Sequence, residues 1–213
     1  MKRFLVGLMV AALAAIGFGG VTAYADPSTD WQLANGSAQG SSGIAAFNFA
    51  VPDKTRLLFN GKDQALLGDK SASTMSASFT VAGVTGNFTY SGQGTASNNC
   101  TGPLTAANVR LYFESIPPGT KFAFTNYWWS NPTTALLANN LNGSLSVSVA
   151  DPTMWSDWDG KFGNQDAATT AAFNAAAANV TAVGLSFGGG CFFENGVGTT
   201  DGSGSFTLTS FAN

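Results

Sequence analysis

The chain has 213 residues, of which nine are basic, twelve are acidic and none is histidine. This acidic balance argues against nucleic acid or an anionic membrane as a partner, because both favour basic surfaces. The lack of histidine also removes the commonest general base and metal ligand, so a histidine-dependent catalytic triad is excluded.

The first 25 residues have the pattern of a secretory signal peptide. A positively charged start at Lys2 and Arg3 precedes an apolar run at 4–16, and Ala25 ends a small-x-small cleavage pattern. We therefore expect a secreted, extracellular protein, with the periplasm as an alternative, and a single β-sandwich domain at residues 26–213. No later segment has the roughly 20 consecutive apolar residues of a membrane helix, so no membrane partner is expected.

The sequence has two cysteines, Cys100 and Cys191. In an exported protein, an isolated pair of this kind favours one disulfide bond. In the chain-entropy model, closing a loop of about 90 residues stabilises the fold by up to 4 kcal/mol.

The chain up to residue 90 contains short apolar segments separated by turns. The region before residue 44 is rich in turn-forming residues, and the expected strands that follow are 44–50, 56–59, 76–81 and 87–90. The last two strands are predicted to be neighbours across the turn at 82–86.

The stretch 108–130 has the highest density of aromatic residues and is predicted to form two strands joined by a Pro-Pro-Gly-Thr turn. Alternation gives the first strand an apolar face, formed by Val109, Leu111 and Phe113, and a polar face, formed by Arg110, Tyr112 and Glu114. The second strand is predicted to continue the apolar face through Phe122 and Phe124. Adjacent residues of a strand point to opposite faces, so at least one of Trp128 and Trp129 is expected in the core.

The rest of the chain adds three alternating strands and one helix. The strands are expected at 144–149, 183–187 and 205–211, and the alanine-rich helix at 167–178, with Asp166 as its N-cap and Phe173 packed inward. About nine or ten short strands and one short helix predict an all-β protein with a jelly-roll-like antiparallel β-sandwich.

Two segments resemble a known family. Residues 57–81, where Leu66-Leu67-Gly68-Asp69 precedes a serine-rich strand, and residues 173–211, a last helix with closing strands, are similar to the laminin IV type A module. The resemblance is one of pattern and covers roughly residues 57–211. It implies a jelly-roll sandwich related in architecture to carbohydrate-binding modules, and it transfers no binding residues. Segments 127–130 and 187–190 also look like parts of secreted bacterial proteins.

Two sets of side chains are candidates for ligand binding. The first fits sugar recognition, because pyranose rings stack on aromatic rings and polar groups bond their hydroxyls: Asn126, Tyr127, Trp129, Trp155 and Trp158. The second is the polar strand face, which a concave sheet would present in a groove: Arg110, Tyr112 and Glu114. The alternatives are that the tryptophans belong to the core or cap the sandwich, and that Arg110 and Glu114 form an ion pair between neighbouring strands.

The carboxylates leave two more interpretations open. Glu114 and Glu194 are the only glutamates, and a pair of carboxylates about 5 to 10 Å apart would suit a glycosidase. Structural calcium would need oxygen ligands, which four aspartates could supply: Asp151, Asp157, Asp159 and Asp166. Their spacing does not match an EF-hand, and the alternative is that they are solvated carboxylates on loops. No other cofactor is expected.

The sequence therefore predicts a secreted, non-catalytic interaction module with an extracellular glycan or matrix component as its partner. Carbohydrate is the candidate ligand. The alternatives are a glycoside hydrolase that uses a carboxylate pair and a structural or protein-binding extracellular domain.

Overall fold

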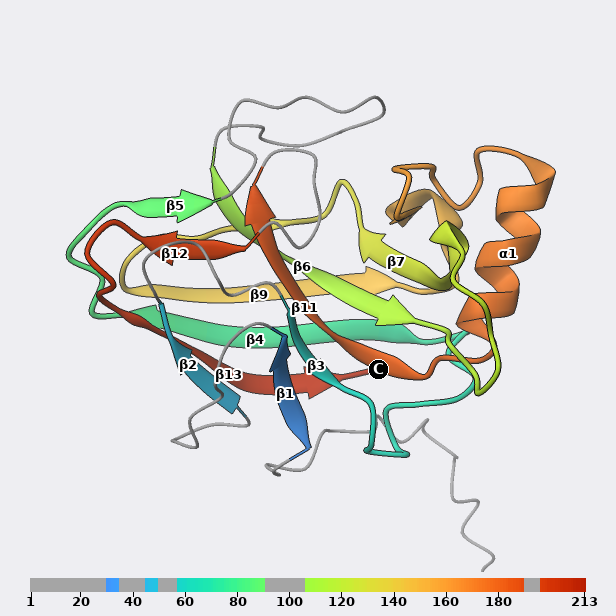
Figure 1. Cartoon of the computed structure of the whole chain (residues 1–213), viewed down its shortest axis with the longest axis horizontal. Coiled ribbons are helices and arrows are strands. Elements are labelled where there is room, and N and C mark those ends of the chain that lie inside the picture. Colours follow the sequence, from blue (N-terminus) through green and yellow to red (C-terminus); the bar gives the residue numbers. More distant parts are fainter. Residues whose placement is uncertain (1–29, 35–44, 50–56, 91–105, 190–195) are drawn as a thin grey trace, which may run out of the picture.

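The computed structural model describes residues 30–34, 45–49, 57–90, 106–189 and 196–213. In these ranges the protein is an all-β, jelly-roll-like antiparallel sandwich with one α-helix, as alternation in the sequence predicts (Figure 1). Several predictions fall outside the described residues: the signal peptide, both cysteines of the expected disulfide, Cys100 and Cys191, and the second glutamate, Glu194.

Two sheets form the layers of the sandwich. The larger sheet has the order β1-β3-β11-β6-β7-β10, with β8 paired to β6. Its strands are β1 (Trp31–Ala34), β3 (Leu57–Asn60), β6 (Ala107–Glu114), β7 (Tyr127–Ser130), β8 (Ala135–Leu136), β10 (Trp155–Asp157) and β11 (Ala182–Gly189). The smaller sheet has the order β2-β13-β4-β9, formed by β2 (Ala45–Asn48), β4 (Thr74–Ala82), β9 (Leu141–Ser148) and β13 (Ser205–Ala212). A separate two-stranded ladder joins β5 (Phe88–Tyr90) to β12 (Val197–Thr199).

The sequence predicts the longer strands and the short strands β2, β3 and β5, but it misses four other short strands. The missed strands are β1, β8, β10 and β12, which have two to four residues and little period-two pattern. The predicted pairing of the strands around the 82–86 turn is wrong, because β4 lies between β13 and β9 whereas β5 pairs with β12.

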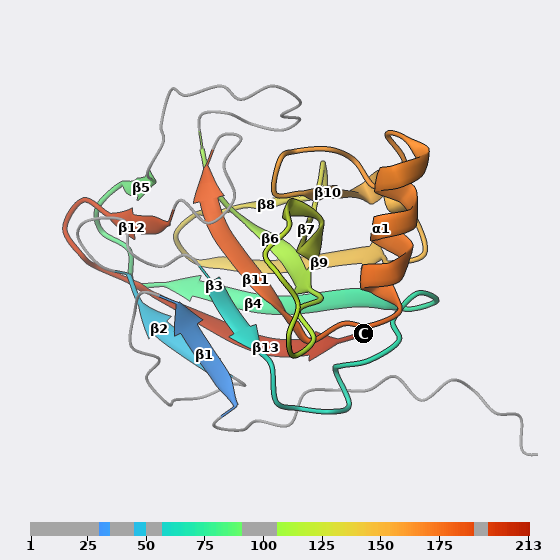
Figure 2. The same ribbon diagram turned by 45° about the vertical axis from the view of Figure 1, so that its right-hand side comes forward.

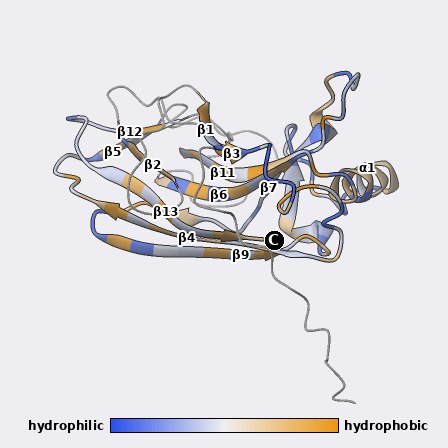
Figure 3. Ribbon diagram, turned by 90° about the horizontal axis from the view of Figure 1, so that it is seen from below, coloured by the Kyte–Doolittle hydropathy of each residue, from blue (hydrophilic) through white to orange (hydrophobic). Residues whose placement is uncertain are grey.

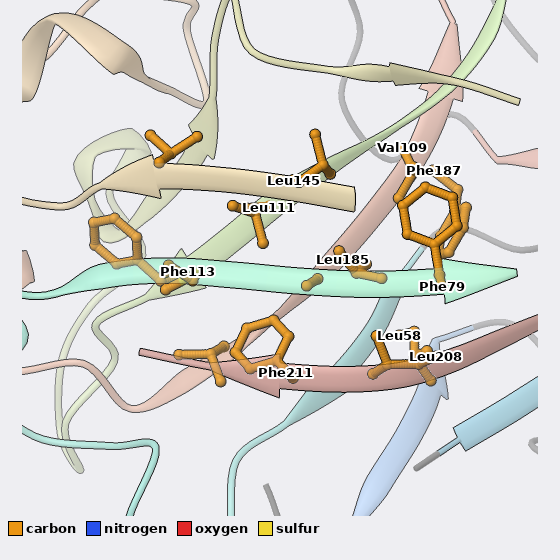
Figure 4. Close-up of a cluster of buried hydrophobic side chains, with 14 of the residues drawn as sticks. Leu58, Phe79, Val109, Leu111, Phe113, Leu145, Leu185, Phe187, Leu208 and Phe211 are labelled. Atoms are coloured by element: carbon orange, nitrogen blue, oxygen red, sulfur yellow. The ribbon is translucent and has the colours of Figure 1, made fainter. Parts of the chain in front are cut away.

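The main core lies between the two sheets. Figure 3 shows the two layers from the side, and Figure 4 shows side chains from both sheets meeting between them. Phe187 of β11 contacts Phe206 of β13 edge to face, with ring centroids 4.9 Å apart. The apolar face predicted for β6 is confirmed, because Val109, Leu111 and Phe113 are fully buried in this core.

Helix α1 (Ala167–Ala177) closes one end of the sandwich (Figure 2). Its predicted N-cap is confirmed, because the Asp166 carboxylate accepts a 2.7 Å hydrogen bond from the backbone N–H of Thr169. Phe173 packs edge to face on Trp128 of β7, with centroids 4.9 Å apart. The helix therefore packs against β7, the strand that also carries the candidate ligand-binding residues Tyr127 and Trp129. Within the described ranges, no helix has the length and apolar character needed to span a bilayer.

Candidate ligand-binding site

A second apolar cluster lies on the outer face of the larger sheet. Tyr112 of β6 lies directly opposite Trp129 of β7, with ring centroids 5.3 Å apart, and Leu57 of β3 completes the buried cluster. Trp128 belongs to the main core on the other face. The adjacent tryptophans therefore occupy opposite faces as predicted, and both are buried.

Burial corrects the expectation that the polar face of β6 lines an open groove. Arg110 and Tyr112 are only 3% and 1% exposed, and burial lowers the pKa of Arg110 to about 10. The Tyr112 hydroxyl donates a hydrogen bond to Oε2 of Glu114 on the same strand. Tyr112 lies beneath the surface because Trp129 of the neighbouring strand packs against it.

Four aromatic side chains around the buried Trp129 extend this cluster to the surface. We call these four together with Trp129 the aromatic patch: Phe122, Phe124, Tyr127, Trp129 and Trp158. Trp158 lies 5.1 Å from Tyr127 and 5.7 Å from Trp129 between ring centroids, and Phe122 lies 5.9 Å from Trp158. Phe122, Phe124 and Trp158 are 62%, 46% and 44% exposed. In the described part of the chain, four large hydrophobic side chains are exposed, and three of them are in this patch.

Asn126 organises the loop that presents Phe122 and Phe124. Its side-chain Nδ2 donates to the carbonyl of Lys121 at 3.0 Å, and its own carbonyl accepts from the N–H of Ser115 at 2.8 Å. Residues Phe124–Asn126 form a 3₁₀ turn, η1, directly before β7. The predicted strand across Phe122 and Phe124 is therefore wrong, because both side chains lie on an exposed loop.

Asp157 organises the turn that presents Trp158. Its Oδ1 accepts hydrogen bonds from the backbone N–H of Asp159 at 3.0 Å and of Lys161 at 2.8 Å. Gly160 has φ +78°, in the left-handed region that glycine adopts without strain. The N–H of Trp158 also donates to the carbonyl of Phe124 at 3.4 Å, which joins this turn to the loop before β7.

Trp155 belongs to the core, which corrects its assignment as a ligand-binding residue. It is fully buried, its ring lies 4.9 Å from that of Phe113, and its Nε1 donates to the carbonyl of Ser148 at 2.9 Å. The pairing of β10 with β7 places Trp155 opposite Ser130 and turns its ring into the sandwich. No face of this ring is available to a ligand.

A pocket of about 430 Å³ lies next to the patch. Its walls are η1, the turn at 157–161 and the first turns of α1. Phe124 contributes to both the patch and the pocket, and the polar lining consists of Thr125, Asp157, Lys161, Asp166 and Thr169. A pocket of this size with an aromatic wall and several polar groups has the general character of a small-molecule site.

The four aspartates considered for calcium have local roles in the backbone. Asp151 accepts from the N–H of Thr153 at 3.0 Å, Asp157 holds its turn, and Asp166 caps α1. Asp159 lies 3.6 Å from the Lys161 ammonium in an exposed ion pair. Across the described ranges, no three acidic, cysteine or histidine side chains are grouped so that they could hold a metal ion.

Glu114 gives the fold a pH dependence that can be tested. Burial raises its pKa, and the hydrogen bond from Tyr112 opposes part of that rise. The folded state therefore binds the Glu114 proton more tightly than the unfolded state does. The protonated carboxyl adds to the free energy of unfolding in full below about pH 4, and this contribution is lost as the pH rises through the pKa of the folded state. Glu114→Gln should flatten this loss in urea unfolding between about pH 4 and pH 7. Tyr112→Phe, which removes the opposing bond, should extend the loss to higher pH; an unchanged pH profile in both variants would contradict the assignment.

The structure brings together part of the residue set predicted from sequence and adds to it. Tyr127 and Trp158 pack against Trp129, and Glu114 lies opposite Tyr127 in the pairing of β6 with β7. Trp129 itself is 1% exposed, which corrects its assignment as a residue that contacts a ligand. Phe122 and Phe124 were not predicted from the sequence to be surface residues, and Phe124 was not predicted to contribute to both the patch and the pocket. The Pro-Pro-Gly run just before them was the available signal, because it favours a longer loop over a tight hairpin.

Comparisons with known protein families, with curated proteins and with solved structures found no match to this chain.

Proposed function

We propose that this protein is a non-catalytic carbohydrate-binding module that uses the aromatic patch as its binding surface. The main support is the clustering of three exposed aromatic residues, in which the rings of Phe124 and Trp158 both contact that of Phe122. Aromatic rings offer a large, rigid apolar surface that suits the C–H face of a pyranose.

The rigidity of the patch supports binding at low entropic cost. Trp129 is buried beneath the surface residues and stacks with Tyr127 at 6.3 Å, while Trp158 closes over both. Backbone bonds from Asn126 and to Asp157 hold the two presenting loops. Binding to such a surface orders few additional side chains.

We also propose that the protein is exported and acts outside the cell on a glycan or matrix component. The predicted signal peptide and the resemblance to the laminin IV type A module support this view. A glycoside hydrolase based on Glu114 and a structural or protein-binding domain are the competing proposals.

The test is a glycan array probed with the mature chain, followed by assay of each bound glycan for released reducing ends. We expect binding without turnover. Turnover that disappears in Glu114→Gln would favour the hydrolase. An array without any binding would contradict the carbohydrate proposal and favour the structural or protein-binding domain.

The proposed disulfide between Cys100 and Cys191 is tested separately. Its support is the register of β6 and β11, in which Ala107 lies opposite Gly189, so the chain segments that lead to the two cysteines leave from neighbouring strands. Thiol labelling of the unreduced, denatured protein should find no free cysteine, and reduction should lower the free energy of unfolding by up to about 4 kcal/mol. Two labelled thiols would contradict the bond.

A further inference from the structure

The pocket beside the aromatic patch is lined by a carboxylate, that of Asp157, with one oxygen that can still accept a hydrogen bond. Asp157 is 1% exposed and lines the pocket. Its Oδ1 accepts two backbone hydrogen bonds, whereas its Oδ2 accepts none from the described residues. Oδ2 is not among the buried side-chain atoms that lack a partner, so it is open to the pocket and can accept a hydrogen bond from a ligand.

The surrounding charges favour a cationic donor. Asp166 lines the same pocket from the start of α1, and Asp159 lies in the turn that Asp157 holds. Lys161 is the only basic residue of the pocket lining, and its ammonium lies 3.6 Å from the carboxylate of Asp159. Two carboxylates therefore line the pocket against one ammonium group, which is itself paired with Asp159, so an anionic ligand is disfavoured there.

We infer that this pocket binds the protonated amino group of a hexosamine residue, with Asp157 as the partner of the ammonium and Phe124 packed against the sugar ring. The inference rests on the proposed carbohydrate function and names the class of sugar. Phe124 is part of both the patch and the pocket, so one glycan chain can contact the exposed aromatics and place a single residue in the pocket.

The chemistry of Asp157 agrees with this assignment. Burial raises the pKa of Asp157, and the negative charge of Asp159 adds to this rise. The hydrogen bonds from the backbone N–H groups of Lys161 and Asp159, together with the positive charge of Lys161, oppose it in part. A ligand ammonium would stabilise the ionised carboxylate and form a charge-assisted hydrogen bond. N-acetylation removes the positive charge, so the acetylated sugar loses this interaction.

The experiment compares two oligosaccharides of equal length, one of glucosamine and one of N-acetylglucosamine, by calorimetry with the mature chain. At a pH below about 7, where the sugar amine is protonated, we expect the glucosamine oligomer to bind about tenfold more tightly. Asp157→Asn keeps the Oδ1 acceptor for the turn and should abolish this preference. Asp69→Asn is the matched control, because Asp69 also accepts a backbone hydrogen bond, from Ser71, but does not line the pocket, and this variant should retain the preference.

A second measurement applies if Asp157→Asn is poorly folded. In the wild-type chain, lowering the pH should protonate Asp157 while the amine stays charged, so the preference for glucosamine should fall as pH falls. Asp159, Lys161 and Asp166 are the other charged groups around this carboxylate. A preference that persists in Asp157→Asn and at low pH would overturn the role of Asp157.

The outcomes separate the inference from the function on which it rests. Equal binding of both oligomers, weakened by Trp158→Ala and unchanged by Asp157→Asn, would overturn the inference and leave the carbohydrate proposal intact. Tighter binding of the acetylated oligomer would overturn it in the same way. Failure of both oligomers and of every glycan on the array would overturn the two together.

Discussion

Replacing Trp155 by alanine is expected to lower the free energy of unfolding by about 3 to 5 kcal/mol, the usual cost of deleting a large buried ring. The ring is fully buried against Phe113, and its Nε1 is bonded to the carbonyl of Ser148. The substitution therefore leaves a cavity between the sheets and removes the shorter of two hydrogen bonds to the carbonyl of Ser148, the other coming from the N–H of Asp151. Urea unfolding followed by circular dichroism measures the loss.

The matched control is Trp158→Ala, in the next turn of the same chain segment. Trp158 is 44% exposed, and we expect its replacement to cost less than about 1 kcal/mol of stability. Similar losses in the two variants would contradict the assignment of Trp155 to the core and Trp158 to the surface.

Replacing Gly184 by alanine is expected to cost about 3 kcal/mol, at the upper end of typical overpacking penalties. Gly184 lies in β11 between Phe59 and Tyr112, and an added Cβ would lie 2.2 Å from the carbonyl oxygen of Leu58 and 2.7 Å from the Cα of Phe59. Both contacts involve backbone atoms, which cannot rotate away as a side chain can. Relief of the overlap therefore requires the neighbouring strand to shift.

Gly61→Ala provides the control for this substitution. Its added Cβ would meet the carbonyl oxygen of Thr181 at 3.5 Å, an ordinary contact. We expect a change within about 0.5 kcal/mol. A thermal unfolding series in which Gly184→Ala is as stable as Gly61→Ala would show that β3 and β11 are not as close as the structure has them.

Local features of the fold were predictable from sequence. Helix α1 depends on neighbours in the chain, namely its alanines and the Asp166 cap, so propensity and capping predict it within one residue of its observed end. The inward side of β6 was predictable because a period of two fixes which residues share a face. The pairing of β5 with β12 was not, because it joins segments more than a hundred residues apart.

The candidate site was only partly predictable, because alternation does not show what covers a strand face. Arg110 and Tyr112 alternate as polar-face residues should, yet both are buried, and Tyr112 packs against Trp129. Trp155 and Trp158 are three residues apart and look equivalent in the sequence. Only the pairing of β10 with β7 distinguishes the core residue from the exposed one.

The measurement that tests the central claim most directly is a calorimetric titration of the strongest array ligand into the wild-type chain and into Trp158→Ala. Leu136→Ala is the control, because Leu136 is another exposed hydrophobic residue, 50% exposed, and pairs with Asn108 at the opposite end of β6. We predict that Trp158→Ala weakens binding by about 2 kcal/mol, roughly thirtyfold, with an unchanged melting temperature, and that Leu136→Ala binds like the wild type. Equal affinity of Trp158→Ala and the wild type would contradict the aromatic patch as the binding surface.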